Sequence, residues 1–128
     1  MIMGKTSNDY LVVNRGSQII ANGTRSKPIR FTHNTAIEGT VGELERGLWG
    51  GIVILGKAPI NKCSNDVRGT AACEKVVEGS NALMGGALVD DNSGKLNFVR
   101  VEYAGYEIFP GNELNGITFG AVGSGTVV

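Results

Sequence analysis

Arg100, Glu102 and Glu107 are the side chains of this chain whose types and spacing could support acid–base chemistry. Arg100 could act as a base beside the two carboxylates, whereas glycoside hydrolysis needs two carboxyl groups roughly 5–10 Å apart in a groove. The alternative is a solvated strand face on which these charges form modest ion pairs. Sequence spacing does not establish the distance between the groups, and we favour the solvated face.

Asp90, Asp91 and Asn92 form a candidate calcium site. Consecutive oxygen ligands on a tight glycine turn suit an ion that takes about six to eight oxygens. The segment lacks the spacing of an EF-hand loop. The alternative is an Asx turn that caps the start of the next strand. We favour the turn, and we expect no cofactor other than this candidate calcium ion.

Trp49, Tyr103 and Tyr106, together with Phe109, could form an aromatic platform that stacks on a sugar ring. The alternative for Trp49 is that its ring fills the core or covers an edge of the fold. His33 is the only histidine, which excludes a metal centre or an acyl-transfer triad built on several histidines. We expect His33 to be a structural hydrogen-bond donor at the end of a strand.

Cys63 and Cys73 are the only cysteines, and both lie in one polar segment. A metal site would need further ligands at suitable spacing, and the segment offers none. We therefore predict a local disulfide between them. The alternative is a pair of unrelated thiols in a reducing compartment.

The elements that must position these residues are short β-branched runs closed by glycine. Leu11–Gly16, Ile52–Gly56 and Ile117–Gly120 resemble one another, and Pro28–His33 resembles Leu96–Tyr103. No helix-forming stretch separates them. Runs that recur in the same order predict a chain that coils and stacks on itself.

Position-by-position matching predicts which residues become neighbours. We expect Val12, Val53 and Thr118 to lie side by side as parallel neighbours in one sheet. We also expect Ile29–Thr32 to lie beside Val99–Glu102, with the second and fourth residue of each run facing solvent. The predicted fold is all-β: a short right-handed parallel β-helix, or solenoid, of about two to three coils with lateral loop excursions. A β-sandwich is the main rival.

The segments between the runs are predicted to be loops. Thr35–Gly47 is interpreted as a surface loop with a helical turn at Gly42–Arg46, and Ala58–Ile60 as a further short strand face. Asn61–Ala82 is a lateral excursion that carries both cysteines, and Tyr106–Leu114 is another loop.

Composition limits the classes of partner. The 128 residues suit a single domain over 1–128. Twelve basic and twelve acidic residues cancel, so we expect no binding to nucleic acid or to an anionic membrane. No apolar stretch approaches the roughly 20 residues of a membrane span, and the first residues lack the apolar region of a signal peptide.

Two motifs carry a resemblance to a known group of proteins: Leu48–Asn61 (LWGGIVILGKAPIN), and Asp91–Gly94 (DNSG) followed by Arg100–Gly105 (RVEYAG). From about Leu11 to Val128 the chain resembles uncharacterised bacterial secreted or surface-attached right-handed parallel β-helix proteins. The resemblance implies an exported or cell-surface location. Such proteins are usually longer, so this chain resembles a truncated copy, such as a short reading frame of a mobile gene cassette or a fragment of a longer solenoid.

The function that we expect is a non-catalytic β-helix scaffold, adhesion or binding module that recognises a glycan or another protein. The alternative is a polysaccharide lyase or glycoside hydrolase acting on a glycan along the β-helix face. A third interpretation is a defective fragment without an independent role. Because no amphipathic capping helix is visible, we also expect a homo-oligomer, such as a homodimer, formed through exposed coil ends.

Overall fold

The chain is built from short β-strands joined by turns and two longer excursions. The structure is a computed structural model that describes residues 1–65 and 67–128, without the side chains of Phe109 and Asn112. The fold is all-β, since the one helix in the described residues, α1 (Asn34–Glu38), has five residues. The strands are β1 (Ile2–Gly4), β2 (Tyr10–Val13), β3 (Ile19–Asn22), β4 (Ile29–His33), β5 (Gly51–Leu55), β6 (Lys75–Val76), β7 (Leu83–Met84), β8 (Gly94–Asn97), β9 (Val99–Val101), β10 (Glu107–Phe109), β11 (Asn112–Glu113) and β12 (Ile117–Gly120).

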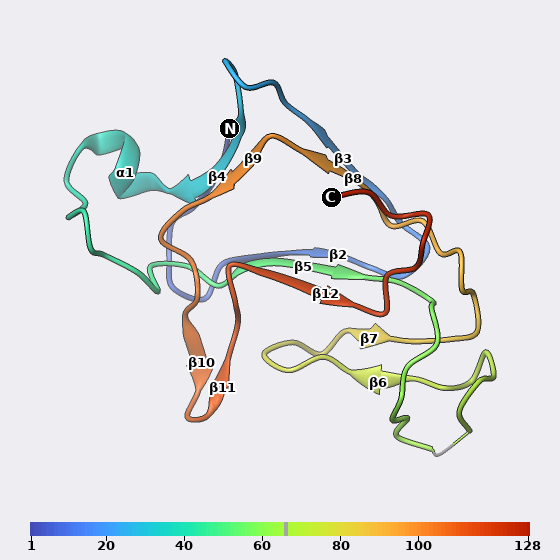
Figure 1. Cartoon of the computed structure of the whole chain (residues 1–128). Coiled ribbons are helices and arrows are strands. Elements are labelled where there is room, and N and C mark those ends of the chain that lie inside the picture. The colour runs from blue at the N-terminus through green and yellow to red at the C-terminus, as the bar shows by residue number, and fades with distance from the viewer. Residues whose placement is uncertain (66) are drawn as a thin grey trace.

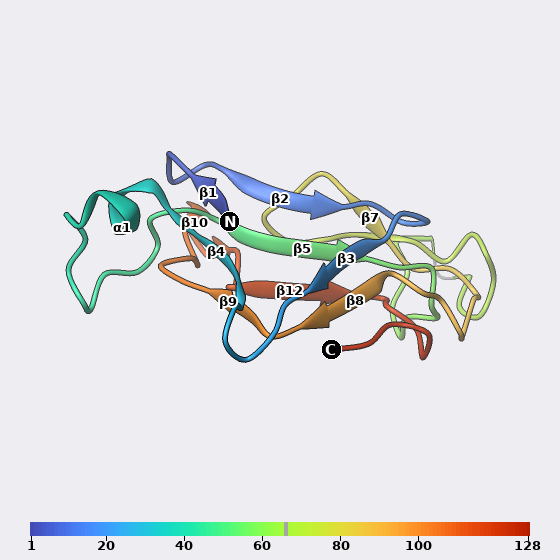
Figure 2. The same ribbon diagram turned by 90° about the horizontal axis from the view of Figure 1, so that it is seen from above.

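The chain passes through three small parallel sheets in the same repeating order. The strand orders are β1-β4-β9, β2-β5-β12 and β3-β8, and every pair within them is parallel. A single parallel bridge from Lys95 to Val127 extends the third sheet. The chain therefore passes through three levels, which begin with β1, β4 and β9. Figure 1 shows the three sheets around one interior, and Figure 2 shows β2, β5 and β12 one below another.

The register within the sheets agrees with the repeats read from the sequence. Val53 pairs with Val12 on one side and with Thr118 on the other, as predicted. Arg30 pairs with Arg100, which also confirms the matching of β4 with β9. Parallel neighbours of this kind carry equivalent side chains on the same face of the sheet.

The interior between the three sheets is the main hydrophobic core. All three sheets contribute buried side chains to it, because inward positions alternate with outward ones along each strand. Its buried members are Val13, Ala21, Phe31, Trp49, Ile52, Ile54 and Leu96. Val99 and Val101 pack against this core from β9, as the alternation in the sequence predicted.

The sheet β2-β5-β12 is covered on its outer face as well. Val53 and Leu55 point away from the interior and pack with Val77 and Leu114 in a second apolar cluster. Val77 follows the hairpin strand β6, and Leu114 follows β11. All five residues of β5 are consequently buried, which explains why this strand is the most continuous apolar run in the chain.

Two glycines permit the close approach of neighbouring levels. Gly51 has φ +114°, and a Cβ added there would meet the carbonyl oxygens of Asn115 and Gly116. Gly94 has φ +115° and lies against the backbone of Ile19 in the same manner. Both positions need a residue without a side chain, since positive φ and the close backbone contact exclude other residues.

Several expectations about the segments between strands were wrong. The helical turn lies at α1 rather than at Gly42–Arg46, because His33 caps it through Nδ1 and Gly39 ends it in the left-handed conformation. Ala58–Ile60 forms no strand, because the chain leaves the sheets there. The Tyr106–Leu114 segment, expected to be a loop, contains the antiparallel hairpin β10–β11.

The outer face of β4 and β9 is also less solvated than predicted. Thr32 is fully buried, and the Glu102 side chain is only 14% exposed. The alternation in the sequence correctly separated inward from outward positions, but arginines on adjacent strands cover the carboxylate of Glu102. Arg100 does face solvent, with its side chain 62% exposed.

Candidate functional site

Arg30, Arg100 and Glu102 form a compact charged cluster on the outer face of the β1-β4-β9 sheet. Arg30 donates from Nη2 to Glu102 Oε2 at 2.7 Å and from Nε to Oε1 at 3.3 Å. Arg100 Nη2 lies 3.0 Å from Oε1 of the same carboxylate. The parallel pairing of Arg30 with Arg100 aligns the two guanidinium groups beside one acceptor. The cluster carries two positive charges and one negative charge.

The electrostatics of this cluster favour its charged form. The hydrogen bond from the Arg30 guanidinium holds the pKa of the Glu102 carboxyl below its usual range, partly offset by burial and helped by the charge of Arg100. Glu102 in turn raises the pKa of Arg30. An arginine that acts as a base must lose its proton, which a bound carboxylate opposes.

Glu107 lies on a different element from the other two predicted catalytic residues. It stands on the β10–β11 hairpin, where its Oε1 accepts a hydrogen bond of 2.7 Å from the backbone N–H of Gly111. In Figure 1 that hairpin points away from β4 and β9. The structure therefore brings Arg100 and Glu102 together but places Glu107 in a separate contact.

The predicted aromatic platform is divided between the core and the surface. Trp49 is 2% exposed, and its indole N–H donates to the carbonyl of Glu102 at 2.8 Å. Its ring fills the core, so it offers no face to a sugar, in line with the alternative reading of this residue. Tyr103 and Tyr106 are partly exposed. The side chain of Phe109 lies outside the described residues.

The Asp90–Gly94 corner is held by hydrogen bonds within it and by one from Lys57. Asp91 is 3% exposed and accepts from the Lys57 backbone N–H at 2.9 Å and from the Ser93 hydroxyl at 2.8 Å. Asn92 Oδ1 accepts from the Gly94 N–H at 2.9 Å, which is an Asx turn. In the part of the chain that the structure describes, no group of three or more His, Cys, Asp or Glu residues is placed to hold a metal ion. Calcium at this corner stays a prediction.

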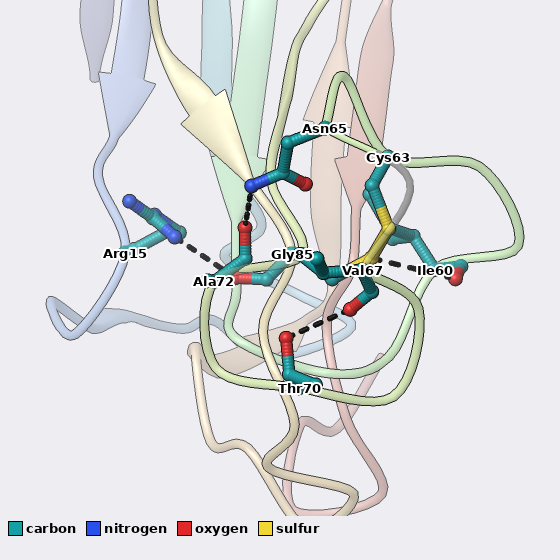
Figure 3. The surroundings of a disulfide bond; sticks show 9 residues. Arg15, Ile60, Cys63, Asn65, Val67, Thr70, Ala72 and Gly85 are labelled. Atoms are coloured by element: carbon teal, nitrogen blue, oxygen red, sulfur yellow. Dashed lines mark hydrogen bonds between the residues drawn. A yellow bond between two sulfur atoms is a disulfide. The ribbon is translucent and has the colours of Figure 1, made fainter.

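The Cys63–Cys73 disulfide is present and braces the excursion between β5 and β8. Around it, Asn65 donates to the carbonyl of Ala72 at 2.8 Å and the Thr70 hydroxyl to the carbonyl of Val67 at 2.7 Å. Figure 3 shows Arg15 reaching this region from the end of β2, where it donates to the carbonyl of Gly85 at 2.9 Å. The excursion is thus connected to the end of β2 through Arg15.

A cavity of about 830 Å³ lies between the corner that follows β2 and the excursion. One part of its lining is aliphatic: Ala82, Leu83, Ala87 and Leu88. Leu83 and Leu88 are 38% and 49% exposed, so apolar surface is open to an incoming molecule. None of the described residues that line the cavity is aromatic.

The polar part of the lining contains two cations and one carboxylate among the described residues: Arg15, Lys57 and Glu74. Arg15 Nη1 lies 2.6 Å from Glu74 Oε1, and their side chains are 21% and 36% exposed. Lys57 is exposed, and no salt bridge of the described residues includes it. The described lining therefore has an excess of positive charge.

Sequence reasoning did not find Arg15, Lys57 or Glu74. A signal for the first two was present, because each follows a β-branched strand at a glycine corner, in Asn14-Arg15-Gly16 and in Gly56-Lys57. Since β2 and β5 are parallel neighbours, the residues that follow them leave the sheet at the same edge. Glu74 had no such signal, because its position depends on how the excursion folds back.

The short strands in small parallel sheets fit an all-β protein, and comparison with known families identifies a β-helix class. The family model of the pectate-lyase-like β-helix domain matches residues 1–128. The chain belongs to this family. Comparisons with curated proteins and with solved structures gave no match. Within the described residues, no helix combines the length and apolar character that crossing a membrane requires.

Proposed function

We propose that this chain is a non-catalytic binding module of an exported or surface protein, built as a right-handed parallel β-helix of about two to three coils. The rotation through three parallel sheets supports the solenoid. The right-handed sense follows from the strong preference of parallel crossover connections for that hand. The ligand is expected to enter the cavity beside the disulfide loop.

The observation that carries the proposal is the separation of the cavity from the residues that could catalyse. Glu102 is bound by two arginines, Glu107 by Gly111, and Asp91 by Lys57 and Ser93. The cavity is lined by other residues, among which Glu74 is the one carboxylate in the described lining and is paired with Arg15. A pair of carboxyl groups flanking a bond, as glycoside hydrolysis requires, is not present in that lining.

Export is supported by the disulfide. Disulfides persist in secreted and surface proteins and are rare where cellular thiols are kept reduced. The Cys63–Cys73 bond is such a disulfide, and both of its cysteines are buried. Its presence therefore favours an oxidising location.

Self-association through the outer levels is part of the proposal. In the described residues β1, β2 and β3 each pair with a strand on one side only. Ile2, Met3 and Ile20 on these strands are exposed, and Phe119 and Val127 are exposed at the other end of the stack. Unpaired strand edges with apolar side chains favour pairing with a second copy. Sedimentation at micromolar concentration would test it, and a monodisperse monomer would exclude it.

A polysaccharide lyase is the second candidate, and the family match favours it. It would use Arg100 beside Glu102 on the open face of the β1-β4-β9 sheet. The two candidates differ in whether a bond in the glycan is broken, so a cleavage assay distinguishes them.

The test is incubation of the purified chain with a panel of acidic and neutral polysaccharides, with and without calcium. We expect no unsaturated products in the ultraviolet absorbance and no new reducing ends. The Arg100→Ala variant serves as the matched comparison. Cleavage by the wild-type chain that is lost in Arg100→Ala would replace the binding module with the lyase.

A further inference from the structure

We infer that the cavity beside the disulfide loop is a binding site for a small organic anion with an aliphatic body, and that Lys57 receives its negative charge. The inference rests on the proposed binding function and deepens it by naming the class of ligand. It starts from the shape of the cavity. A volume of about 830 Å³ lies within the roughly 300–1,000 Å³ range of sites that take small molecules.

Lys57 is fixed in place by its backbone while its side chain is left available. Its N–H donates to Asp91 Oδ1 at 2.9 Å, and its carbonyl accepts from the N–H of Leu88 at 2.8 Å. The ammonium group lies along Gly16, where an added Cβ would be 3.1 Å from Nζ. The anchored backbone fixes where the side chain of Lys57 starts, and Lys57 is one of the residues that line the cavity.

The charges around Lys57 leave its ammonium group without a neutralising partner among the described residues. Glu74, the one carboxylate of the described lining, lies 2.6 Å from Arg15. Arg15 also donates to the carbonyl of Gly85, so its position is set by two acceptors. An anionic group of the ligand would complete the charge balance of the site.

The remaining lining defines the body of the ligand. Leu83 and Leu88 present exposed aliphatic surface, and Asn14 and Asn81 add amide groups that can donate or accept hydrogen bonds. The absence of aromatic side chains from the described lining removes the flat surfaces on which sugar rings stack. The lining thus suits an acyl chain or a similar aliphatic acid better than a neutral sugar.

The experiment is a titration of the intact disulfide-bonded chain with octanoate, with octanamide as the uncharged probe of the same length. Leucine methyl resonances report where the probe binds. We expect shifts at Leu83 and Leu88, and a Kd for octanoate about fivefold or more below that for octanamide. We also expect octanoate binding to weaken as salt rises, because ions screen the pairing with Lys57.

Variants of Lys57 test the role of its charge. Lys57→Met keeps the aliphatic stem and should weaken octanoate binding about fivefold without changing octanamide binding. Lys57→Arg should restore most of the affinity. Lys27→Met removes an exposed lysine at a different corner and should leave both affinities unchanged.

Equal affinity for octanoate and octanamide, shifts away from Leu83 and Leu88, or no binding at millimolar concentration would each overturn the inference. A neutral glycan that shifts the same methyl groups would also overturn it, while leaving the proposed binding function in place. Failure of the proposed function would instead appear as polysaccharide cleavage that depends on Arg100.

Discussion

The sheets β2-β5-β12 and β1-β4-β9 have the same parallel geometry but opposite outer faces. Val53 and Leu55 of the first are covered by the segments that follow β6 and β11. Arg30 and Arg100 of the second are open to solvent on one side, with 37% and 62% of their side chains exposed. The difference arises from the excursions, which leave the stack and fold back over one sheet only.

This contrast shows how a set of parallel strands comes to border a cavity. On the charged face, both Arg30 and Arg100 already pair with the carboxylate of Glu102. The covered face is bordered by a cavity whose walls come from distant parts of the chain, including Arg15 and Leu88. A recess requires an added segment, since a wall of paired strands is nearly flat.

Truncation of the outward-facing Leu55 should give the largest loss of stability. The side chain is fully buried between β5 and the excursion. Leu55→Ala should lower the free energy of unfolding by about 2–5 kcal/mol, because it removes buried apolar contacts and leaves a cavity. Urea unfolding followed by circular dichroism measures this loss.

The matched change on the open sheet is Arg100→Ala. We expect it to lower the free energy of unfolding by about 0.5 kcal/mol or less. The Arg100 side chain is mostly solvated, and Glu102 retains its hydrogen bond from Arg30. Comparable losses in the two variants would contradict the distinction between the two outer faces.

Removal of the disulfide should have an intermediate and local effect. The double variant Cys63→Ser and Cys73→Ser should have a free energy of unfolding about 2–3 kcal/mol lower, as expected for a loop of this size. Hydrogen exchange should accelerate in β6 and β7 and remain slow in β4 and β9, because the bond braces only the excursion. Uniform acceleration across both sheets would mean that the excursion and the stack unfold as one unit.

An effect smaller than that of the disulfide should come from the charge of Glu102. Its pKa is lowered in the folded chain, so its charge stabilises the fold at neutral pH, and this contribution is lost as the pH falls below about 4.3, the ordinary glutamate value. Glu102→Gln should lower the free energy of unfolding by about 1 kcal/mol at pH 7 and by less at pH 3. Unfolding experiments at both pH values measure the difference.

The control for this prediction is Glu43→Gln, which removes the charge of an exposed carboxyl group outside the sheets. It should change stability little at either pH. A cost for Glu102→Gln that does not depend on pH would show that packing, rather than charge, accounts for the contribution of this residue.

The parallel pairing of the strands was largely predictable because its information is local. Short β-branched runs ending in glycine marked β2, β5 and β12, and their equivalent residues predicted the register of Val12, Val53 and Thr118. The disulfide was predictable because both cysteines lie in one segment. The positions of Thr32 and Glu102 were not, because their covering depends on side chains from adjacent levels.

The cavity could not be predicted from periodicity. Its lining joins Arg15 and Lys57, which follow two stacked strands, to Glu74 and Leu88 in the excursion. The excursion has no repeating pattern, and its course depends on the disulfide and on backbone contacts such as Leu88 N–H to the carbonyl of Lys57. Long-range closure of this kind leaves little trace in the spacing of residues.

The return of the chain at β8 has a consequence for how such proteins can diversify. After the long segment that follows β5, Gly94–Asn97 rejoins β3 with all four residues in register. The length and composition of the inserted segment can therefore vary at small entropic cost, since closure of a longer loop costs only slightly more. Recombination or drift within that segment would reshape the recess, while the strands beneath it fold as before.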